Sequence, residues 1–148
     1  MQNGEIQIKT GKDILASEIT ALRRSVNCDK HGSCADVERS MEAYPFTAMA
    51  RNKNGELVGY VSAFSDGVYT TMIGELLVRP DCQRHGIGAA LLKRVELRYP
   101  GVSVTLYCDA GQQMFFARQG YTSNENEMFV MTKDKTLLNE RVISWATG

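Results

Sequence analysis

The sequence of 148 residues lacks long apolar runs and an excess of either charge. No run approaches the ~20 consecutive apolar residues that a transmembrane helix needs, so we expect no membrane partner. Residues 1–5 form neither a basic nor an apolar segment, so we expect no signal peptide. Seventeen Lys and Arg residues balance seventeen Asp and Glu residues. This balance argues against a nucleic-acid partner, because proteins that bind nucleic acid usually carry a basic excess.

Cysteine is also scarce, which excludes a scaffold built on disulfides. The chain contains no CxxC pair, and its four cysteines are Cys28, Cys34, Cys82 and Cys108. We expect reduced thiols and a cytoplasmic location. The first two cysteines share a loop with Asp29 and His31, but their spacing matches no common zinc pattern. We therefore expect no metal site.

The length and an apolar content of 43% are those of one domain with one core. We assign the domain to residues 1–132 and leave the structure of the tail, residues 133–148, unassigned. The hydrophobic pattern predicts strands around residues 6–8 and at 46–51, 57–64, 68–78, 102–106 and 128–131. It predicts helices after Asp13 and at 35–43, 87–98 and 112–119. This order predicts an α/β fold, a mixed sheet that begins with antiparallel hairpins and contains one strand-helix-strand crossover.

The stretch from Glu75 to Leu92 is the most informative part of the sequence. A strand leads into a polar loop, and Gly86 and Gly88 then begin a helix. Glycine lets the backbone approach a ligand closely, and the free N–H groups at a helix start favour an anion such as a diphosphate. A single Gly-x-Gly is weak evidence, so a capped loop without a ligand remains an alternative.

A dinucleotide-binding turn is a second interpretation of the same loop. Asp109 follows Gly88 by roughly the ~20 residues at which such turns carry an acidic residue. However, Leu91 stands where the third Gly or Ala is expected, and a long loop separates Val78 from Gly86. The preceding strands also form hairpins rather than a parallel unit. A nicotinamide-dependent oxidoreductase is therefore disfavoured.

The third interpretation is a pyrophosphate loop for coenzyme A, which rests on a resemblance to a family. Residues 83–88, Gln-Arg-His-Gly-Ile-Gly, resemble the Q/R-x-x-G-x-G/A signature of the GCN5-related N-acetyltransferases (GNAT). Residues 76–80 resemble the end of that family's fourth strand, L-x-V-x-P, and residues 115–121 resemble its F-Y-x-x-x-G-F motif. The order of elements agrees with the family from residue 5 to about residue 132.

The resemblance implies a GNAT-type sheet, largely antiparallel, with flanking helices. In that fold the strand ending at Val78 and the strand at 102–108 splay apart and admit the pantetheine arm of acetyl-CoA. The implied reaction transfers acetyl from acetyl-CoA to a primary amine of a small molecule or peptide, by direct attack in a ternary complex. The Leu76 N–H would contact the thioester carbonyl. The residues that this resemblance assigns to the cofactor are Leu76, Leu77, Val78, Gln83, Arg84, His85, Gly86, Ile87, Gly88, Ala89 and Phe116.

The resemblance also implies a homodimer, for which the apolar residues of the tail are candidates.

Acetyl transfer needs a base, because an alkylamine with a pKa near ~10.4 is almost fully protonated at pH 7. Glu75 is the candidate base, since several members that act on small amines carry Asp or Glu at this position. A salt bridge at the strand end is its alternative role.

The proton donor is where the sequence departs from the family. Many members have a donor Tyr at the position of Phe116, which cannot donate a proton. We select Tyr107 as the candidate donor over Tyr121 and Cys108. Cys108 is also the one candidate for a covalent acetyl intermediate. A catalytically weak or inactive module that binds acetyl-CoA as a sensor, or binds a partner, is therefore the alternative function.

Overall fold

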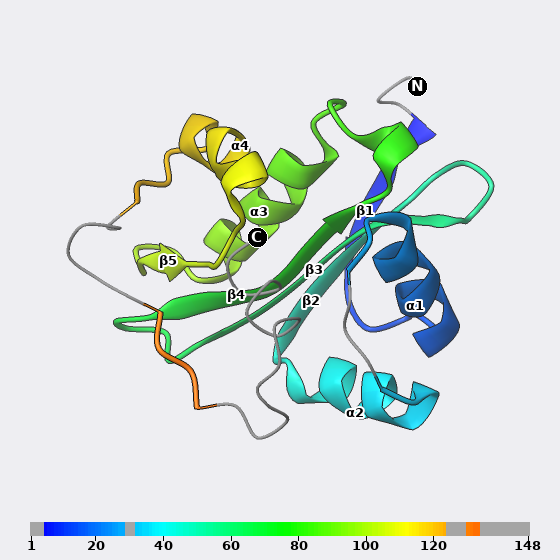
Figure 1. The fold of residues 1–148 in the computed structure, drawn as a ribbon, viewed down its shortest axis with the longest axis horizontal. Helices are drawn as coiled ribbons and strands as arrows, with labels where there is room; N and C mark the ends of the chain where they lie inside the picture. Colours follow the sequence, from blue (N-terminus) through cyan, green and yellow to red (C-terminus); the bar gives the residue numbers. More distant parts are fainter. Residues whose placement is uncertain (1–4, 29–31, 124–129, 134–148) are drawn as a thin grey trace. The chain divides into compact units, whose positions relative to one another are not determined.

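The computed structural model describes residues 5–28, 32–123 and 130–133 (Figure 1). The chain divides into two compact units between Leu106 and Tyr107. The first unit contains β1 (Gln7–Thr10), α1 (Ala16–Ser25), α2 (Cys34–Ala43), β2 (Phe46–Arg51), β3 (Leu57–Ser65), β4 (Thr71–Val78), η2 (Pro80–Cys82), α3 (Ile87–Arg98) and β5 (Val104–Thr105). The second contains η3 (Ala110–Gln112) and α4 (Gln113–Arg118). The domain boundary at residue 132 stays a prediction, and residues 134–148 of the tail lie outside the described residues.

The five strands form one sheet in the order β1-β2-β3-β4-β5. All neighbouring strands are antiparallel except β4 and β5, which run parallel and are connected through α3. The mixed, largely antiparallel α/β fold predicted from the sequence is therefore confirmed. The β2–β3 hairpin turns at Asn54 and Gly55 as expected, because Gly55 adopts the left-handed conformation with a φ of 79°.

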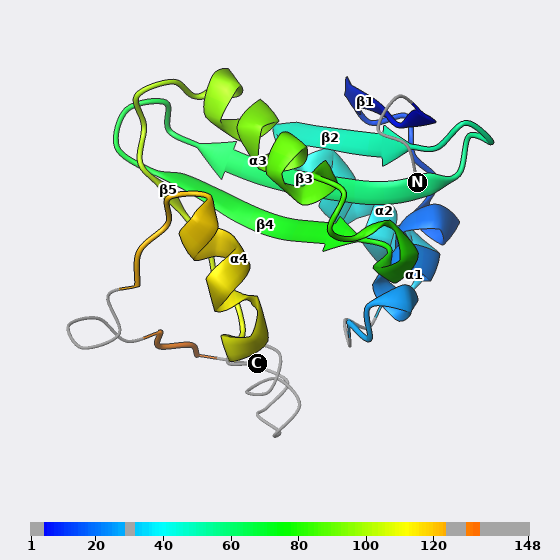
Figure 2. The same cartoon turned by 90° about the horizontal axis from the view of Figure 1, so that it is seen from above.

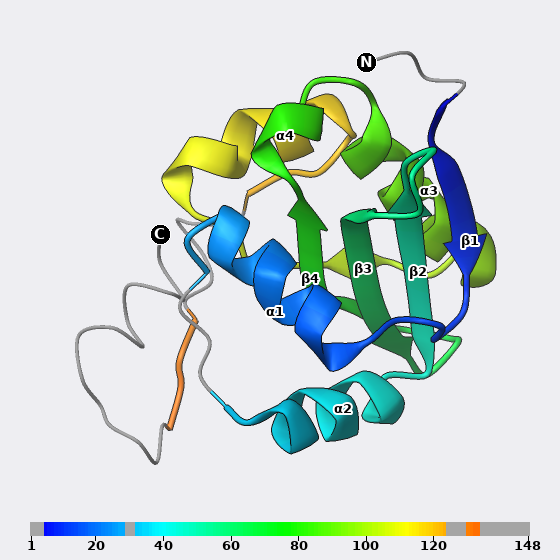
Figure 3. The same ribbon diagram turned by 90° about the vertical axis from the view of Figure 1, so that its right-hand side faces the viewer.

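Helices cover both faces of the sheet within the first unit (Figures 2 and 3). On one face, apolar side chains of α1 and α2 pack with side chains of β2, β3 and β4 in a single core that includes Ile19, Leu22, Val37, Met41, Met49, Tyr60 and Leu77. On the other face, α3 lies against β3. A side chain at Gly59 would meet Ile87 and Leu91 at 3.0 and 3.1 Å, so the glycine lets α3 approach the strand closely.

Several element boundaries differ from those predicted. β4 begins at Thr71 rather than Val68, because the Asp66 carboxylate accepts hydrogen bonds from the backbone N–H groups of residues 68–70 and holds them in a turn. Leu15, not Asp13, is the N-cap of α1, and Glu18 accepts its backbone N–H.

The last two predicted strands also differ. β5 contains only Val104 and Thr105 of the predicted strand at 102–106. Of the predicted strand at 128–131, residues 128 and 129 lie outside the described residues, and Val130 and Met131 are not in a strand.

Candidate functional site

Among the described residues, the outer edge of β4 is open over most of its length in the sense that no strand pairs with it. β5 pairs with β4 only at Thr71 and Met72, and residues 106–109 are not in a strand. Within the described part of the chain, β4 therefore has no strand partner on this side from Ile73 to Val78. A strand edge without a strand partner offers backbone N–H and C=O groups to an extended ligand. This opening fits the expected splay between the two strands.

The open edge of β4 leads into the loop before α3. Arg84 and Gly86 both have left-handed conformations, with φ values of 65° and 84°, and Gly86 is the N-cap of α3. A Cβ atom at Gly86 would meet nothing within 4 Å, so the space beside its backbone is open. The first N–H groups of α3 have no partner within the helix and lie at the positive end of its dipole. These features fit a diphosphate.

Side chains of the loop itself contact backbone carbonyl groups and hold the loop in place. Gln83 Nε2 donates to the Val78 carbonyl at 2.9 Å, which ties the loop to the last residue of β4. His85 Nδ1 lies 2.7 Å from the Gln83 carbonyl oxygen. Cys82 is fully buried, and Arg84 is exposed. Gln83 therefore shapes the loop with its side chain, whereas Arg84 is available to a ligand.

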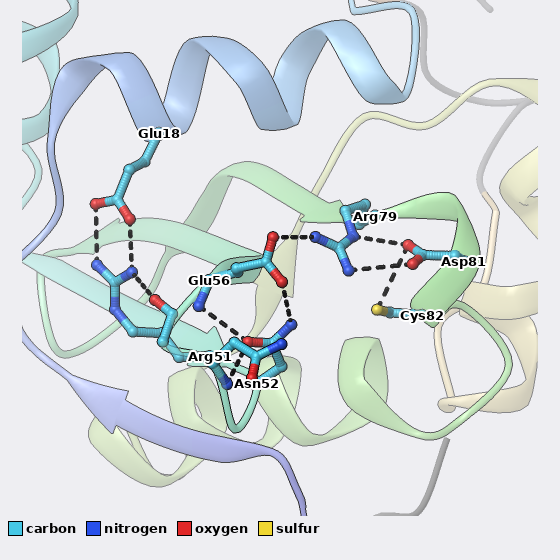
Figure 4. Close-up of polar contacts among 9 residues, drawn as sticks. Glu18, Arg51, Asn52, Glu56, Arg79, Asp81 and Cys82 are labelled. Atoms are coloured by element: carbon cyan, nitrogen blue, oxygen red, sulfur yellow. Dashed lines mark hydrogen bonds and ion pairs between the residues drawn. The ribbon is translucent and has the colours of Figure 1, made fainter.

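A polar network that the sequence did not predict supports the start of the loop (Figure 4). Arg79 donates to both carboxylate oxygens of Asp81, at 2.7 and 3.1 Å, and lies 3.6 Å from Glu56 in the β2–β3 hairpin. Asn52 Nδ2 donates to the other Glu56 oxygen at 2.9 Å. At the base of the same hairpin, Arg51 forms an ion pair with Glu18 of α1 at 2.6 Å. The network joins the hairpin to η2, where the loop begins.

Glu75, the candidate base, lies in the middle of β4 and forms a buried ion pair. Arg23 of α1 donates to both of its oxygens, at 2.7 and 3.0 Å, and the two side chains are 11% and 9% exposed. Burial lowers the pKa of Arg23, but the hydrogen bond and charge of Glu75 outweigh it and leave that pKa raised. Glu75 thus forms a salt bridge, in the middle of β4 rather than at the strand end, and its role as base stays a prediction.

Two tyrosines that the sequence did not single out as site residues lie near this ion pair. Burial, followed by the charge of Glu75, raises the pKa of both Tyr44 and Tyr60. Tyr60 is 1% exposed and belongs to the core, whereas Tyr44 is half-buried. Tyr44 directly follows the end of α2, and nothing in its sequence context marks it as a site residue.

The remaining candidates belong to the second unit. Tyr107 is 54% exposed. Phe116 is 8% exposed, and its ring lies 5.0 and 5.9 Å from those of Phe115 and Tyr121. Burial and the charge of Asp109 raise the pKa of the Cys108 thiol, which disfavours the thiolate that a covalent intermediate would need.

Two kinds of feature, a metal-binding cluster and a membrane-spanning helix, are absent from the described residues. No group of three or more His, Cys, Asp or Glu side chains suited to a metal ion occurs among them. No helix in the part of the chain that the structure covers is long and apolar enough to cross a membrane.

Comparison with known proteins decides the family. A model of the GNAT acetyltransferase domain matches residues 45–123, more than half of the chain. The chain belongs to the GNAT family of acetyltransferases. The matched range contains β2 to α4, and with them the open edge of β4 and the loop before α3.

Individual relatives of this GNAT protein are distant. It is 32% identical over 75 residues to serotonin N-acetyltransferase 2, chloroplastic, of Oryza sativa subsp. japonica, a match that covers 49% of this chain and 38% of the relative. A GNAT family structure from Streptococcus pneumoniae aligns with a TM-score of 0.74 at 19% identity, over 89% of this chain and 99% of that one. A Deinococcus radiodurans protein assigned as an acetyltransferase aligns with a TM-score of 0.71 at 20% identity, over 99% and 96% of the two chains. At these identities the structural matches show the shared fold.

Proposed function

We propose that this protein transfers the acetyl group of acetyl-CoA to a primary amine by direct attack. The observation that carries the proposal is the order of the backbone: the open edge of β4 leads through the short helix η2 into the loop at 83–88 and then into the first turn of α3. An extended arm that ends in a diphosphate matches this sequence of backbone groups. The family membership supports acetyl transfer as the reaction.

Each part of the cofactor has candidate residues in this chain. Leu76, Leu77 and Val78 would pair with the pantetheine arm through their backbone groups. Residues 83–89 would hold the diphosphate through backbone N–H groups, and Arg84 would add a contact strengthened by its charge. Acetyl-CoA would supply the activated thioester. Phe116 remains a proposed cofactor contact from the family resemblance.

The catalytic roles rest on the same proposal. The Leu76 N–H would stabilise negative charge on the thioester oxygen. Glu75 would take a proton from the incoming ammonium group, directly or through water, so that the neutral amine can attack. Tyr107 would return a proton to the sulfur as the carbon–sulfur bond breaks.

The acceptor is proposed as an amine of a small molecule or a peptide, and the relative from rice is named for an amine substrate, serotonin. A homodimer and a cytoplasmic location also remain proposals. The apolar tail residues suggested for the dimer contact, 137–145, lie outside the described residues.

Incubation with acetyl-CoA and a panel of primary amines tests the function. We expect release of free thiol that depends on the amine, together with an acetylated amine detected by mass spectrometry. Thiol release without acetylated amine would indicate hydrolysis instead. Intact thioester after long incubation with the whole panel, in a protein that still binds CoA, would contradict the proposal and favour the sensor or interaction module.

A further inference from the structure

The pairing between β3 and β4 is interrupted at one residue of β4. On β3 and β4, Ser62 lies opposite Glu75, and the next pair joins Ala63 to Ile73. Gly74 therefore has no partner on β3 and forms a bulge. Bulges often occur beside active sites, where they redirect the backbone and the neighbouring side chains.

The side chain of Tyr44 fills the space that a side chain at Gly74 would need. A Cβ atom at Gly74 would lie 2.4 Å from the Tyr44 hydroxyl oxygen and 2.5 Å from Cζ. Only glycine permits this contact, and its φ is not in the left-handed region, so the reason for glycine here is space. The Tyr44 ring is also 6.0 Å from the ring of Phe64 on β3. The hydroxyl end of the phenol is thereby placed at the bulge, one residue from Glu75.

The Tyr44 hydroxyl is available for a further contact. Tyr44 is half-buried, and its hydroxyl forms no hydrogen bond with any of the described residues. Burial, followed by the charge of Glu75, raises its pKa, so the phenol stays neutral throughout the range in which an amine would be acetylated. A neutral phenol oxygen can accept a hydrogen bond from an amine N–H and leave the nitrogen lone pair free to attack.

We propose that Tyr44 is part of the acceptor site and that its hydroxyl accepts a hydrogen bond from the attacking amine at the Gly74 bulge. This inference rests on the proposed function. The bulge at Gly74 and the neighbouring Glu75 both lie in the part of β4 that has no strand partner on its outer edge, so the amine would stand beside the residue proposed as its base. Tyr44 orients the amine and does not itself gain or lose a proton.

The surroundings of Tyr44 also indicate a class of acceptor. The nearest charges, Arg23 and Glu75, neutralise each other in their ion pair. Phe64 is 46% exposed beside the Tyr44 ring, and the half-buried Met72 lies opposite it on β4. A site with no net charge and with aromatic side chains beside it suits a monoamine whose remaining part is apolar better than it suits a polyamine.

Steady-state kinetics of Tyr44→Phe test the role of the hydroxyl. The substitution removes one oxygen and keeps the ring pair with Phe64, so we expect an unchanged midpoint of thermal unfolding. With phenylethylamine as acceptor, kcat/KM for the amine should fall about 5- to 10-fold, the effect of one hydrogen bond. The KM for acetyl-CoA should not change. Tyr69→Phe, at a residue that is 80% exposed in the β3–β4 turn, is the matched control and should behave as wild type.

The outcomes separate this inference from the proposed function. Equal kcat/KM for the amine in Tyr44→Phe and wild type would overturn the role of Tyr44 while leaving acetyl transfer intact. A rise in the KM for acetyl-CoA that matches the loss for the amine would also overturn it, because that result indicates a general structural change. A higher kcat/KM for spermidine than for phenylethylamine would overturn the acceptor class. Failure of the wild-type protein to acetylate any amine would overturn both this inference and the proposed function.

Discussion

Arg23 Nη2 lies 2.7 Å from Glu75 Oε1, and Arg23 Nε lies 3.0 Å from Oε2, so a bidentate ion pair joins α1 to the middle of β4. Both side chains are almost fully buried. A buried pair of this kind is costly to break, because the remaining partner keeps its charge away from water. The pair therefore links the stability of the fold to the position of the carboxylate proposed as the base.

Removal of Arg23 tests the contribution of this pair to stability. We expect Arg23→Met to lower the free energy of unfolding by about 3–5 kcal/mol, because the buried Glu75 carboxylate loses both hydrogen bonds and the opposite charge that Arg23 supplies. The double variant Arg23→Met with Glu75→Leu should recover most of that loss, since it removes both charges. Urea unfolding at pH 7 measures both variants. A cost below about 1 kcal/mol for Arg23→Met, as found for exposed pairs, would contradict the account.

Glu75→Gln tests the proposed base. The amide keeps the size of the side chain but cannot remove a proton, so kcat/KM should fall by ~10²-fold or more. The KM for acetyl-CoA should stay near that of wild type. Circular dichroism at the assay temperature establishes that the variant is folded, which separates lost chemistry from the lost ion pair. Wild-type kinetics in a folded Glu75→Gln protein would remove Glu75 from the mechanism.

Gly86→Ala tests the loop before α3. With a φ of 84° at this residue, a Cβ atom introduces backbone strain of about 1–2 kcal/mol, although the space around it is open. We expect lower stability and weaker binding of CoA. Gly55→Ala is the matched control, because Gly55 also has a left-handed φ, 79°, and open space around it, but lies in the β2–β3 turn. The control should lose similar stability and bind CoA as wild type. Equal CoA binding in both variants would argue against a role for Gly86.

The Glu18–Arg51 pair predicts how stability depends on pH. The hydrogen bond from Arg51 lowers the pKa of Glu18 below that of the unfolded chain. Its contribution is therefore fully present above the unfolded value, about 4.3 for Glu, and is lost as the pH falls through the lower folded value. The midpoint of thermal unfolding should be higher for wild type than for Glu18→Gln at pH 7, and this difference should shrink below about pH 4. A difference that stays constant down to pH 3 would contradict the prediction.

Local sequence patterns predicted much of the fold, whereas long-range contacts were out of their reach. The hairpin at Asn54 and Gly55 and the helix that follows Gly86 were predicted because turn chemistry and periodicity are local signals. The length of β5 was overestimated because alternating apolar residues at 102–106 report burial rather than pairing. No local sequence pattern could identify Arg23 as the partner of Glu75, because the two residues are 52 positions apart in the chain.

In the candidate site, too, the residues marked by local patterns were predicted, and those that depend on long-range contacts were not. The loop at 83–88 was found from its glycines and its resemblance to a family motif. Tyr44 was not identified as a candidate, because the role proposed for it depends on a bulge at Gly74 that no residue pattern marks. The sequence alone showed that Phe116 has no hydroxyl group. Only the three-dimensional structure shows that the hydroxyl group of Tyr44 lies at the bulge beside Glu75.

Thermal unfolding with acetyl-CoA, CoA and NADH, each at saturating concentration, tests the central claim that the β4 edge and the loop at 83–88 bind coenzyme A. A ligand present at ~100 times its Kd adds ~2.7 kcal/mol to stability, which raises the midpoint by several degrees for a chain of this size. We predict a shift with acetyl-CoA and CoA, none with NADH, and a smaller CoA shift in Gly86→Ala than in Gly55→Ala. Absence of a shift with CoA, or a shift with NADH alone, would contradict the claim.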